Sequence, residues 1–371
     1  MERLKLVCPC HFGLESVLKF EVNKIGGEDI SVSDGRVSFY GGEELVSRAN
    51  LCLATAERVL IELGEFDAYS FDDLFEGVKK LPWEYYISKA DAFPVKGHSL
   101  DSQLHSIPDC QAIIKKAVVD RLGGKYGVKW FEETGSIHRI QFSIIKDRAA
   151  IYLDTSGTGL HKRGYRKNSN AAPIKETLAA GIIDLARVRS DTQFYDPFCG
   201  SGTFLIEAAY KAMNIAPGIK RSFAAEKWDC FSSEIWREER SKAIAAINKD
   251  ADFFAFGSDI DPESTALSAE NCAKAGIRNK VKITCADVRD FSPDKGGIIV
   301  CNPPYGERML ELKEAEELYS VMGKVFPANG DCPSYIISPH EDFERFFGKR
   351  ADKRRKLYNG MIKCQLFMYF K

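Results

Sequence analysis

The second half of the chain alternates short apolar runs with longer stretches whose apolar residues recur at helical spacing. Four of these runs have the length of buried strands, and they lie within residues 192–195, 253–261, 281–287 and 297–301. Strands that alternate with helices predict an open, mostly parallel sheet covered by helices. We therefore expect an α/β domain whose strands end at one common edge, where such sheets bind their ligands.

The first 155 residues follow a different order. Their pattern predicts a strand at 4–7, a helix at 14–25, strands at 30–32 and 36–40, a helix at 43–52 and a strand at 58–64. This β-α-β-β-α-β order is typical of a ferredoxin-like unit. A second α+β segment follows, with helices at 71–81 and 109–122 and paired strands at 138–146 and 148–155. We therefore expect three domains, at 1–65, 66–155 and 156–371.

The apolar run at 192–195 leads into a glycine-rich turn and then into a helix. The turn consists of Asp196, Pro197, Phe198, Cys199, Gly200, Ser201, Gly202 and Thr203. Gly200 and Gly202 have no Cβ atom, so the backbone can turn sharply and approach a ligand closely. Asp196 can accept a hydrogen bond from a ligand amine or ammonium group, or from water. The motif fits a nucleoside cofactor, although an ordinary tight turn would carry the same glycines.

Two later strands also end in acidic residues. Asp259, followed by Ile260, lies at the tip of the second strand, where a carboxylate can bind both hydroxyls of a ribose. Asp261 precedes a proline and is expected to cap the next helix instead. Asp287, followed by Val288, ends the third strand and could accept a hydrogen bond from the amino group of an adenine.

The fourth apolar run ends in Asn302, Pro303, Pro304 and Tyr305. Neither proline can continue a strand or donate a backbone hydrogen bond, so the two lock an extended loop. The amide oxygen of Asn302 and the Pro303 carbonyl suit the exocyclic amino group of a base, and Tyr305 can stack on that base. Taken alone, the motif could also be a polar turn.

The glycine-rich turn and the 302–305 loop, with acid-tipped strands between them, resemble the class I S-adenosylmethionine-dependent methyltransferases that act on exocyclic amino groups of nucleic-acid bases. The resemblance implies a Rossmann-like α/β domain with a mixed seven-stranded sheet, preceded by the α+β region. It also implies S-adenosylmethionine as the cofactor, held by residues 196–203, Asp259, Ile260, Asp287 and Val288. Asn302, Pro303, Pro304 and Tyr305 are then the expected catalytic residues.

The region before this domain resembles an RNA-binding module. The segment 66–155, with Lys96 after its first strand, resembles a THUMP domain, which implies RNA binding. An α+β domain without an RNA role is the alternative. Residues 160–180 resemble the linker and first helix of THUMP-linked guanine methyltransferases, and this implies Thr177 as a further cofactor contact.

Two basic stretches, residues 160–167 and 349–356, and one insertion are candidate RNA-contacting surfaces. Residues 160–167 combine cations with an aromatic ring, a composition that suits a nucleic-acid strand but also occurs on solvated surfaces. An insertion at 213–250 carries Trp228, Phe231 and Trp236, which we expect to cover the sheet rather than to stack on RNA. The candidate RNA contacts are Lys96, His161, Lys162, Arg163, Tyr165, Arg166, Arg308, Arg354 and Arg355.

Composition adds limits to this picture. The net charge of the 371 residues is −1, so any basic surface must be local. The first residues lack the apolar core of a signal peptide, and no run approaches the ~18 apolar residues of a membrane helix. Eleven cysteines fit reduced thiols, and we expect a cytoplasmic protein. Cys8, Cys10 and His11 have no second ligand pair at zinc spacing, so no metal site is expected.

Over nearly the whole chain, the sequence resembles the stand-alone form of bacterial 23S ribosomal RNA guanine-N2 methyltransferases, a group often labelled N6-adenine-specific DNA methylases. The resemblance implies methyl transfer to N2 of a guanine in RNA, with ribosomal RNA or a pre-ribosomal particle as the partner. Guanine-N2 methylation of transfer RNA and adenine-N6 methylation of DNA or RNA are the alternative enzymatic functions. An RNA-binding ribosome assembly factor is the alternative that is not an enzyme.

Overall fold

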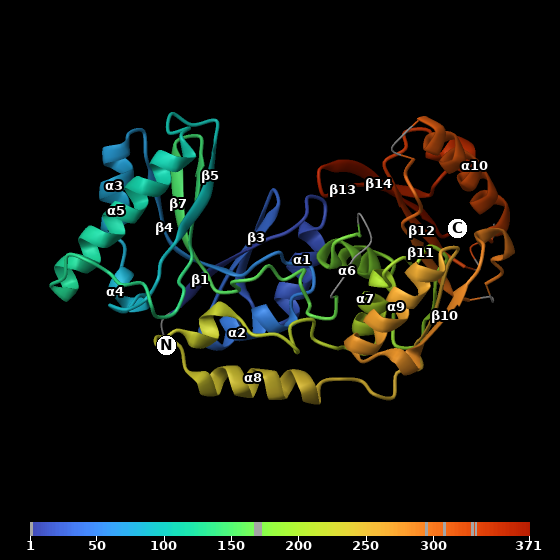
Figure 1. Cartoon of the computed structure of the whole chain (residues 1–371), viewed down its shortest axis with the longest axis horizontal. Coiled ribbons are helices and arrows are strands. Elements are labelled where there is room, and N and C mark those ends of the chain that lie inside the picture. The colour runs from blue at the N-terminus through green and yellow to red at the C-terminus, as the bar shows by residue number, and fades with distance from the viewer. Residues whose placement is uncertain (1–2, 167–172, 294–295, 307–308, 328–329, 331) are drawn as a thin grey trace. The chain divides into compact units, whose positions relative to one another are not determined.

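The structure is a computed structural model that describes residues 3–166, 173–293, 296–306, 309–327, 330 and 332–371. Over these residues the chain forms two units, each with a seven-stranded sheet of its own (Figure 1). The N-terminal unit comprises Met1–Pro9, Lys19–Leu160 and Arg221–Lys242, and the C-terminal unit comprises Cys10–Leu18, His161–Lys220 and Ala243–Lys371. Within the described part of the chain, no helix is long and apolar enough to cross a membrane.

The sheet of the N-terminal unit joins the two expected α+β segments edge to edge. It has the strand order β2-β3-β1-β4-β7-β6-β5, and the join is the antiparallel pair of β4 and β7, in which Leu60 lies opposite Asp154. The strands are β1 (Leu4–Pro9), β2 (Glu28–Ser33), β3 (Arg36–Gly41), β4 (Leu60–Asp67), β5 (Val95–Leu100), β6 (Ile140–Ile145) and β7 (Arg148–Asp154). The segments 1–65 and 66–155 therefore share one continuous sheet.

Helices pack around this sheet, and the sequence marks their ends. The helices are α2 (Glu43–Cys52), α3 (Phe71–Lys79), α4 (Trp83–Tyr86) and α5 (Ile107–Tyr126), whereas α1 (Glu15–Lys24) is divided between the two units after Leu18. Ser70 caps α3 in a capping box, in which its side chain accepts from the backbone N–H of Asp73 at 3.1 Å while Asp73 accepts from the backbone N–H of Ser70 at 2.9 Å. Gly127 ends α5 with a left-handed φ of +65°.

The aromatic residues of the insertion belong to the N-terminal unit. Trp228 is buried, its ring stacks on His138 with 4.4 Å between centroids, and its Nε1 donates to the carbonyl oxygen of Ile137 at 3.1 Å. Phe231 and Trp236 are buried as well, the latter in α8 (Ser233–Ala245). The expectation that these rings cover the C-terminal sheet was wrong, because their apolar surface packs within the other unit.

The C-terminal unit is the expected α/β domain with a mixed sheet. Its strand order is β10-β9-β8-β11-β12-β14-β13, in which the first five strands are parallel and β14 is antiparallel to both of its neighbours, β12 and β13. The strands are β8 (Gln193–Asp196), β9 (Phe254–Asp259), β10 (Val281–Cys285), β11 (Ile298–Cys301), β12 (Ser334–Ser338), β13 (Lys353–Asn359) and β14 (Ile362–Tyr369). The helices are α6 (Glu176–Leu185), α7 (Thr203–Ala212), α9 (Pro262–Ala275), α10 (Met309–Val325) and α11 (Phe343–Phe347), with three-residue 3₁₀ turns at Arg278–Lys280 and Val288–Asp290.

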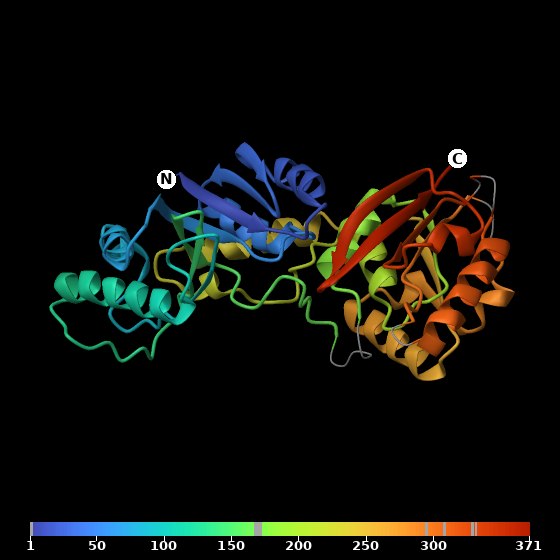
Figure 2. The ribbon, with the colours of Figure 1, turned by 90° about the horizontal axis from the view of Figure 1, so that it is seen from above.

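Alternate residues of the central strands feed two separate cores, one on each face of this sheet. Phe194 and Val300 pack with residues of α6, α7 and α9, whereas their neighbours Tyr195 and Ile299 pack with residues of α10 and α11. This period of two is what a strand buried on both faces requires. The final hairpin, drawn in red along one side of the unit in Figure 2, turns through Gly360 at φ +64°, a conformation that Asn-Gly turns favour.

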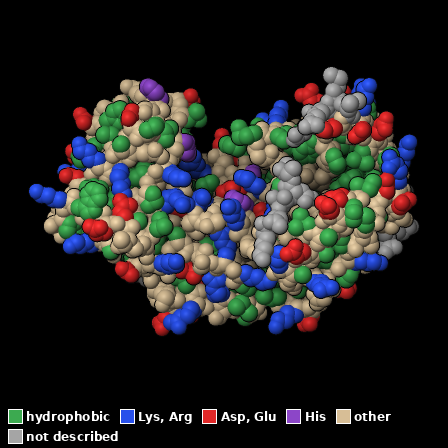
Figure 3. Space-filling view, in the orientation of Figure 1, with side chains coloured by type: hydrophobic (Ala, Val, Ile, Leu, Met, Phe, Trp, Pro, Cys, Tyr) green, Lys and Arg blue, Asp and Glu red, His purple; other side chains and the backbone are tan. Residues whose placement is uncertain are grey.

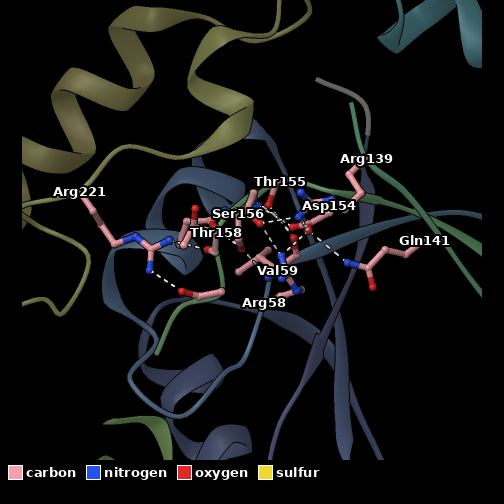
Figure 4. A network of polar contacts seen from close by, with 12 residues as sticks. Arg58, Val59, Arg139, Gln141, Asp154, Thr155, Ser156, Thr158 and Arg221 are labelled. Atoms are coloured by element: carbon pink, nitrogen blue, oxygen red, sulfur yellow. Dashed lines mark hydrogen bonds and ion pairs between the residues drawn. The ribbon is translucent and has the colours of Figure 1, made fainter. Parts of the chain in front are cut away.

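A buried carboxylate holds the loop that follows β7 in the N-terminal unit (Figure 4). Asp154 has no solvent-exposed surface, and it accepts from Gln141 Nε2 at 3.1 Å and pairs with the guanidinium groups of Arg58 and Arg139. Both arginines also donate to the carbonyl oxygen of Gly157, at 2.6 and 2.7 Å. The Asp154 carboxylate thus bridges the two guanidinium groups and fixes the loop.

Replacement of Asp154 by alanine should destabilise the N-terminal unit, because it leaves the Arg58 and Arg139 guanidinium groups side by side without their carboxylate. We expect a loss of about 3 kcal/mol in the free energy of unfolding, measured by chemical denaturation. Glu65→Ala is the matched control, because it removes an exposed ion pair with Arg148. Equal stabilities of the two variants would contradict this role for Asp154.

Candidate active site

A cavity of about 950 Å³ opens at the carboxyl edge of the C-terminal sheet. It is lined by residues that follow β8, β9, β10 and β11, by the first turns of α10 and by the turn of the β13–β14 hairpin. Parallel strands bring their carboxyl ends to one edge, so segments far apart in sequence meet there. The predicted residues that line this cavity are Asp196, Pro197, Phe198, Cys199, Gly200, Ser201, Thr203, Asp259, Ile260, Asp287, Val288, Asn302, Pro303, Pro304 and Tyr305.

Thr177 does not line the cavity. It lies fully buried in α6, and its hydroxyl is 3.4 Å from His11 Nε2. The cavity wall is formed instead by Pro173, Ile174 and Lys175, just before the helix begins. Thr177 lies two residues after Lys175, and its contact with the cofactor stays a prediction.

The glycine-rich turn takes a backbone conformation that side chains rarely permit. Gly200 and Gly202 have φ angles of +48° and +81°. A Cβ atom on Gly202 would lie 2.5 Å from Ser268 Oγ. A residue of α9 also holds the turn, because Asn271 Nδ2 donates to the Ser201 carbonyl at 2.9 Å. The backbone of this turn therefore lies close against α9 on one side and faces the cavity on the other.

Asp196 brings a carboxylate into the floor of the cavity with 1% of its surface exposed. Its Oδ1 accepts from the backbone N–H of Phe198 at 3.1 Å. Burial, together with the negative charge of Asp259, holds the pKa of Asp196 well above its usual value, although the Phe198 N–H acts in the opposite direction. A bound cation would offset this cost, so the position suits a ligand ammonium group.

Asp259 connects the first two strand ends. Its Oδ2 accepts from the Gly200 N–H at 2.9 Å, and its Oδ1 accepts from the Asp261 N–H at 3.1 Å. Asp261 caps α9 by accepting from the N–H groups of Glu263 and Ser264, which confirms its predicted role as a helix cap. Each Asp259 oxygen keeps a lone pair for a ligand hydroxyl.

Asp287 faces the cavity from the third strand end, and Arg289 already contacts both of its oxygens. The Arg289 backbone N–H donates to Oδ1 at 2.8 Å, and its guanidinium group pairs with Oδ2 at 2.6 Å. These contacts, the backbone hydrogen bond first, lower the pKa of Asp287. The carboxylate is thus held as an anion and as a hydrogen-bond acceptor at the cavity rim.

The 302–305 loop is held by hydrogen bonds that the sequence did not predict. The Tyr305 hydroxyl donates to Asn302 Oδ1 at 2.5 Å and accepts from Asn359 Nδ2 at 3.2 Å. Tyr319 in α10 donates its hydroxyl to the Pro304 carbonyl at 2.9 Å. Sequence reasoning missed Tyr319 and Asn359, because an aromatic on an apolar helix face and an asparagine in a hairpin turn carry no signal of such contacts.

Two members of the predicted RNA-contacting group lie in the core. Arg163 is buried and pairs with the Glu207 carboxylate, with both nitrogen–oxygen distances at 3.2 Å, and Tyr165 is buried against the same carboxylate. A buried guanidinium paired in this way cannot reach a phosphate. The expectation that Arg163 and Tyr165 line an RNA path is therefore wrong for this conformation.

The remaining members lie closer to solvent. Arg166 is largely covered and donates to Thr203 Oγ1 at 2.5 Å, which ties it to the glycine-rich turn.

Arg354 is exposed and pairs with Glu344 at 2.7 Å, and Arg355 donates to Ser16 Oγ at 3.0 Å. Lys96 and Lys162 are exposed and His161 is half-buried, whereas Arg308 lies outside the described residues. On the face shown in Figure 3, basic and acidic side chains are interspersed, so no single cationic surface dominates it.

Three families match consecutive parts of the chain. Residues 5–60 match the RlmL ferredoxin-like domain, residues 68–154 match the THUMP domain, and residues 163–367 match the RMKL-like methyltransferase domain. The chain is 42% identical over its whole length to a Bacillus subtilis protein named "Putative RNA methyltransferase YpsC", of which it covers 97%. It is 32% identical to the ribosomal RNA large subunit methyltransferase K/L of Psychromonas ingrahamii, but it spans only half of that longer protein.

Solved structures show the same fold over the full chain. A Listeria monocytogenes protein termed a "predicted N6-adenine-specific DNA methylase" has a TM-score of 0.94 at 42% identity, covering 100% of this chain and 96% of that one. SMU.472, crystallised with S-adenosylhomocysteine (SAH), has a TM-score of 0.94 at 38% identity, covering 100% and 98%. S-adenosylmethionine is therefore the cofactor. The buried Asp196 carboxylate fits its ammonium group, and the left-handed glycine turn lets the backbone lie close to it.

Gly202→Ala should weaken SAH binding, because the new methyl group meets Ser268 Oγ while the backbone keeps a left-handed φ. We expect roughly a tenfold loss of affinity by calorimetry, and partial recovery when Ser268→Ala is added. Gly348→Ala is the matched control, because Gly348 has a similar φ of +76° with nothing within 4 Å of its Cβ position. Full SAH affinity in Gly202→Ala would contradict the placement of the turn.

SAH affinity should fall as the pH falls through the raised pKa of Asp196. Protonation removes the negative charge that would pair with the ligand ammonium group, so binding is stronger where Asp196 is ionised. Calorimetric titrations over a series of pH values test this, and Asp196→Asn should bind weakly with a flatter pH dependence. An identical pH profile in the wild type and in this variant would exclude Asp196 as the titrating group.

Proposed function

The chain belongs to the family of RMKL-like, S-adenosylmethionine-dependent methyltransferases, and from this premise we propose that it methylates the exocyclic N2 of a guanine in RNA, with 23S ribosomal RNA as the substrate. The observation that carries the proposal is the meeting of Asn302 and Pro303 with Asp196 and Asp259 in one cavity. The two hydrogen-bond acceptors for the target amine and the carboxylates for the cofactor therefore lie in the same cavity.

The front of the chain supports RNA as the substrate class. Residues 68–154 match the THUMP domain, a module that accompanies RNA-modifying enzymes, and the ribosomal RNA methyltransferase K/L aligns with 99% of this chain. The adenine-specific name of the Listeria monocytogenes relative supports the second candidate, adenine-N6 methylation, because that reaction uses the same Asn-Pro-Pro-Tyr loop. The RNA-binding front favours guanine in RNA over adenine in DNA.

Each acidic residue of the cavity would bind a different part of the cofactor. Asp196 would hold the ammonium end of S-adenosylmethionine, Asp259 its ribose and Asp287 the amino group of its adenine. When bound, the cofactor supplies an electrophilic methyl group on a sulfonium. The target base leaves its stack to enter the cavity, where Tyr305 offers an aromatic surface.

Asn302 and Pro303 orient the amine. The Asn302 Oδ1 and the Pro303 carbonyl oxygen accept its two hydrogens, which turns the nitrogen lone pair away from them and toward the methyl donor. The amine proton becomes acidic once the nitrogen is alkylated, so the reaction needs no strong base beforehand. Rate enhancement then comes mainly from proximity and orientation.

The direct test incubates the protein with methyl-labelled S-adenosylmethionine and separate ribosomal RNA, transfer RNA and DNA, followed by digestion to nucleosides. We expect label in N2-methylguanosine from 23S RNA. Asn302→Ala should reduce its rate by at least about 100-fold without loss of SAH affinity, because the transferred group loses an oriented acceptor. Asn248→Ala, an exposed asparagine of the same unit, is the control and should keep full activity.

The other outcomes separate the alternatives. Label in transfer RNA would change the substrate and keep the chemistry. Label confined to N6-methyladenine would refute the guanine assignment. Absence of label from every nucleic acid, in protein that binds SAH, would refute methylation of naked RNA, and a pre-ribosomal particle would then be the substrate to test.

A further inference from the structure

We propose that Asn359, in the turn of the β13–β14 hairpin, is a positioning residue that sets the direction of the hydrogen bond from Tyr305 to Asn302. The proposal rests on the proposed function, because it assigns to Asn359 control over the acceptor for the target amine. Asn359, Tyr305 and Asn302 all line the cavity. Their polar atoms form a chain, with 3.2 Å from Asn359 Nδ2 to the Tyr305 oxygen and 2.5 Å from that oxygen to Asn302 Oδ1.

The direction of this chain follows from the number of hydrogens available. A phenol has one hydrogen, and its oxygen can also accept. Because Asn359 donates to the Tyr305 oxygen, the phenol hydrogen is left for the contact with Asn302. The Cys364 thiol is 4.0 Å from the same oxygen, but its one hydrogen has a nearer acceptor in the Ile362 carbonyl oxygen at 3.6 Å, so Asn359 is the donor to Tyr305. Burial raises the pKa of Tyr305, so the phenol keeps its hydrogen.

This direction determines which end of the Asn302 amide faces the substrate. A phenol hydrogen must meet an oxygen, so it holds Oδ1 in place and turns the amide NH2 group away. Oδ1 has a second lone pair, which remains for a hydrogen of the target amine. If the amide were flipped, its NH2 group would face the substrate NH2 group, two donors would oppose each other and the base could not be oriented.

The hairpin is a firm support for Asn359. Asn359 lies opposite Ile362 in the last pair of the β13–β14 ladder, and Gly360 makes the turn at φ +64°. Leu357 and Cys364, on either side of the turn, have 0% and 1% of their surface exposed. The last two strands of the sheet thereby contribute a polar group to the cavity as well as closing the fold.

Asn359→Asp tests the direction of the chain without a change of volume. A carboxylate cannot donate to Tyr305, so the phenol hydrogen turns toward it and Asn302 loses its partner. Asn359→Ala removes the donor but leaves the phenol free to donate to Asn302. We expect kcat to fall about tenfold in Asn359→Asp and only about twofold in Asn359→Ala, with an unchanged KM for S-adenosylmethionine. A packing role predicts the opposite order, because aspartate fills the space and alanine does not.

The control is Met361→Ala, in the same turn with 97% of its surface exposed, which should keep the wild-type kcat. In a Tyr305→Phe background, the two Asn359 variants should have equal rates, because the group through which they act is gone. An Asn359→Asp variant as fast as Asn359→Ala, or a difference that survives in Tyr305→Phe, would overturn the proposal.

A structural readout keeps this test separate from that of the proposed function. In crystals of the SAH complex, the wild type should retain the contact between Tyr305 and Asn302 Oδ1, whereas in Asn359→Asp the phenol should pair with the new carboxylate and leave Asn302. If the wild type methylates no nucleic acid, the proposed function fails, and this comparison still decides the direction of the chain. A Tyr305–Asn302 contact unchanged in Asn359→Asp would overturn the proposal.

Discussion

The buried carboxylate of Asp196 is the constraint around which the C-terminal unit is organised. A charge with 1% of its surface exposed is costly unless it is paired, and here a second acid, Asp259, raises that cost further. The two acids lie close together because β8 and β9, whose carboxyl ends carry them, are neighbours in a parallel sheet. Asp259 is in turn held by the N–H of Gly200, so the acids and the glycine turn form one structure. In the proposed function, the ammonium group of S-adenosylmethionine would offset this cost.

The strand ends could be predicted from the sequence because the signal is local. An apolar run followed at once by an acid, or by Asn-Pro-Pro-Tyr, places the polar group at the carboxyl tip of a strand, and parallel pairing then brings the tips together. The cap at Asp261 and the turn at Gly360 are local in the same way. These signals account for the main architecture of the C-terminal unit and for half of the residues that line the cavity.

The predictions that failed depend on partners distant in sequence. The basic stretch at 160–167 suggested a phosphate-binding surface, but Arg163 finds Glu207 and becomes part of the core. Trp228 stacks on His138, which lies in a different module of the sequence pattern. The hydrogen bonds of Tyr319 and Asn359 with the 302–305 loop also join segments that only the fold brings together. A single sequence does not specify such pairs, because each partner is an ordinary residue in its own segment.

The crystal structure of this protein with SAH would test the account most directly. We expect the SAH ammonium group to contact Asp196 and both ribose hydroxyls to contact Asp259, with the sulfur facing Asn302 across the cavity. Binding of SAH with its ammonium group away from Asp196, or with its sulfur remote from the 302–305 loop, would contradict the view that one cavity brings the cofactor and the target amine together.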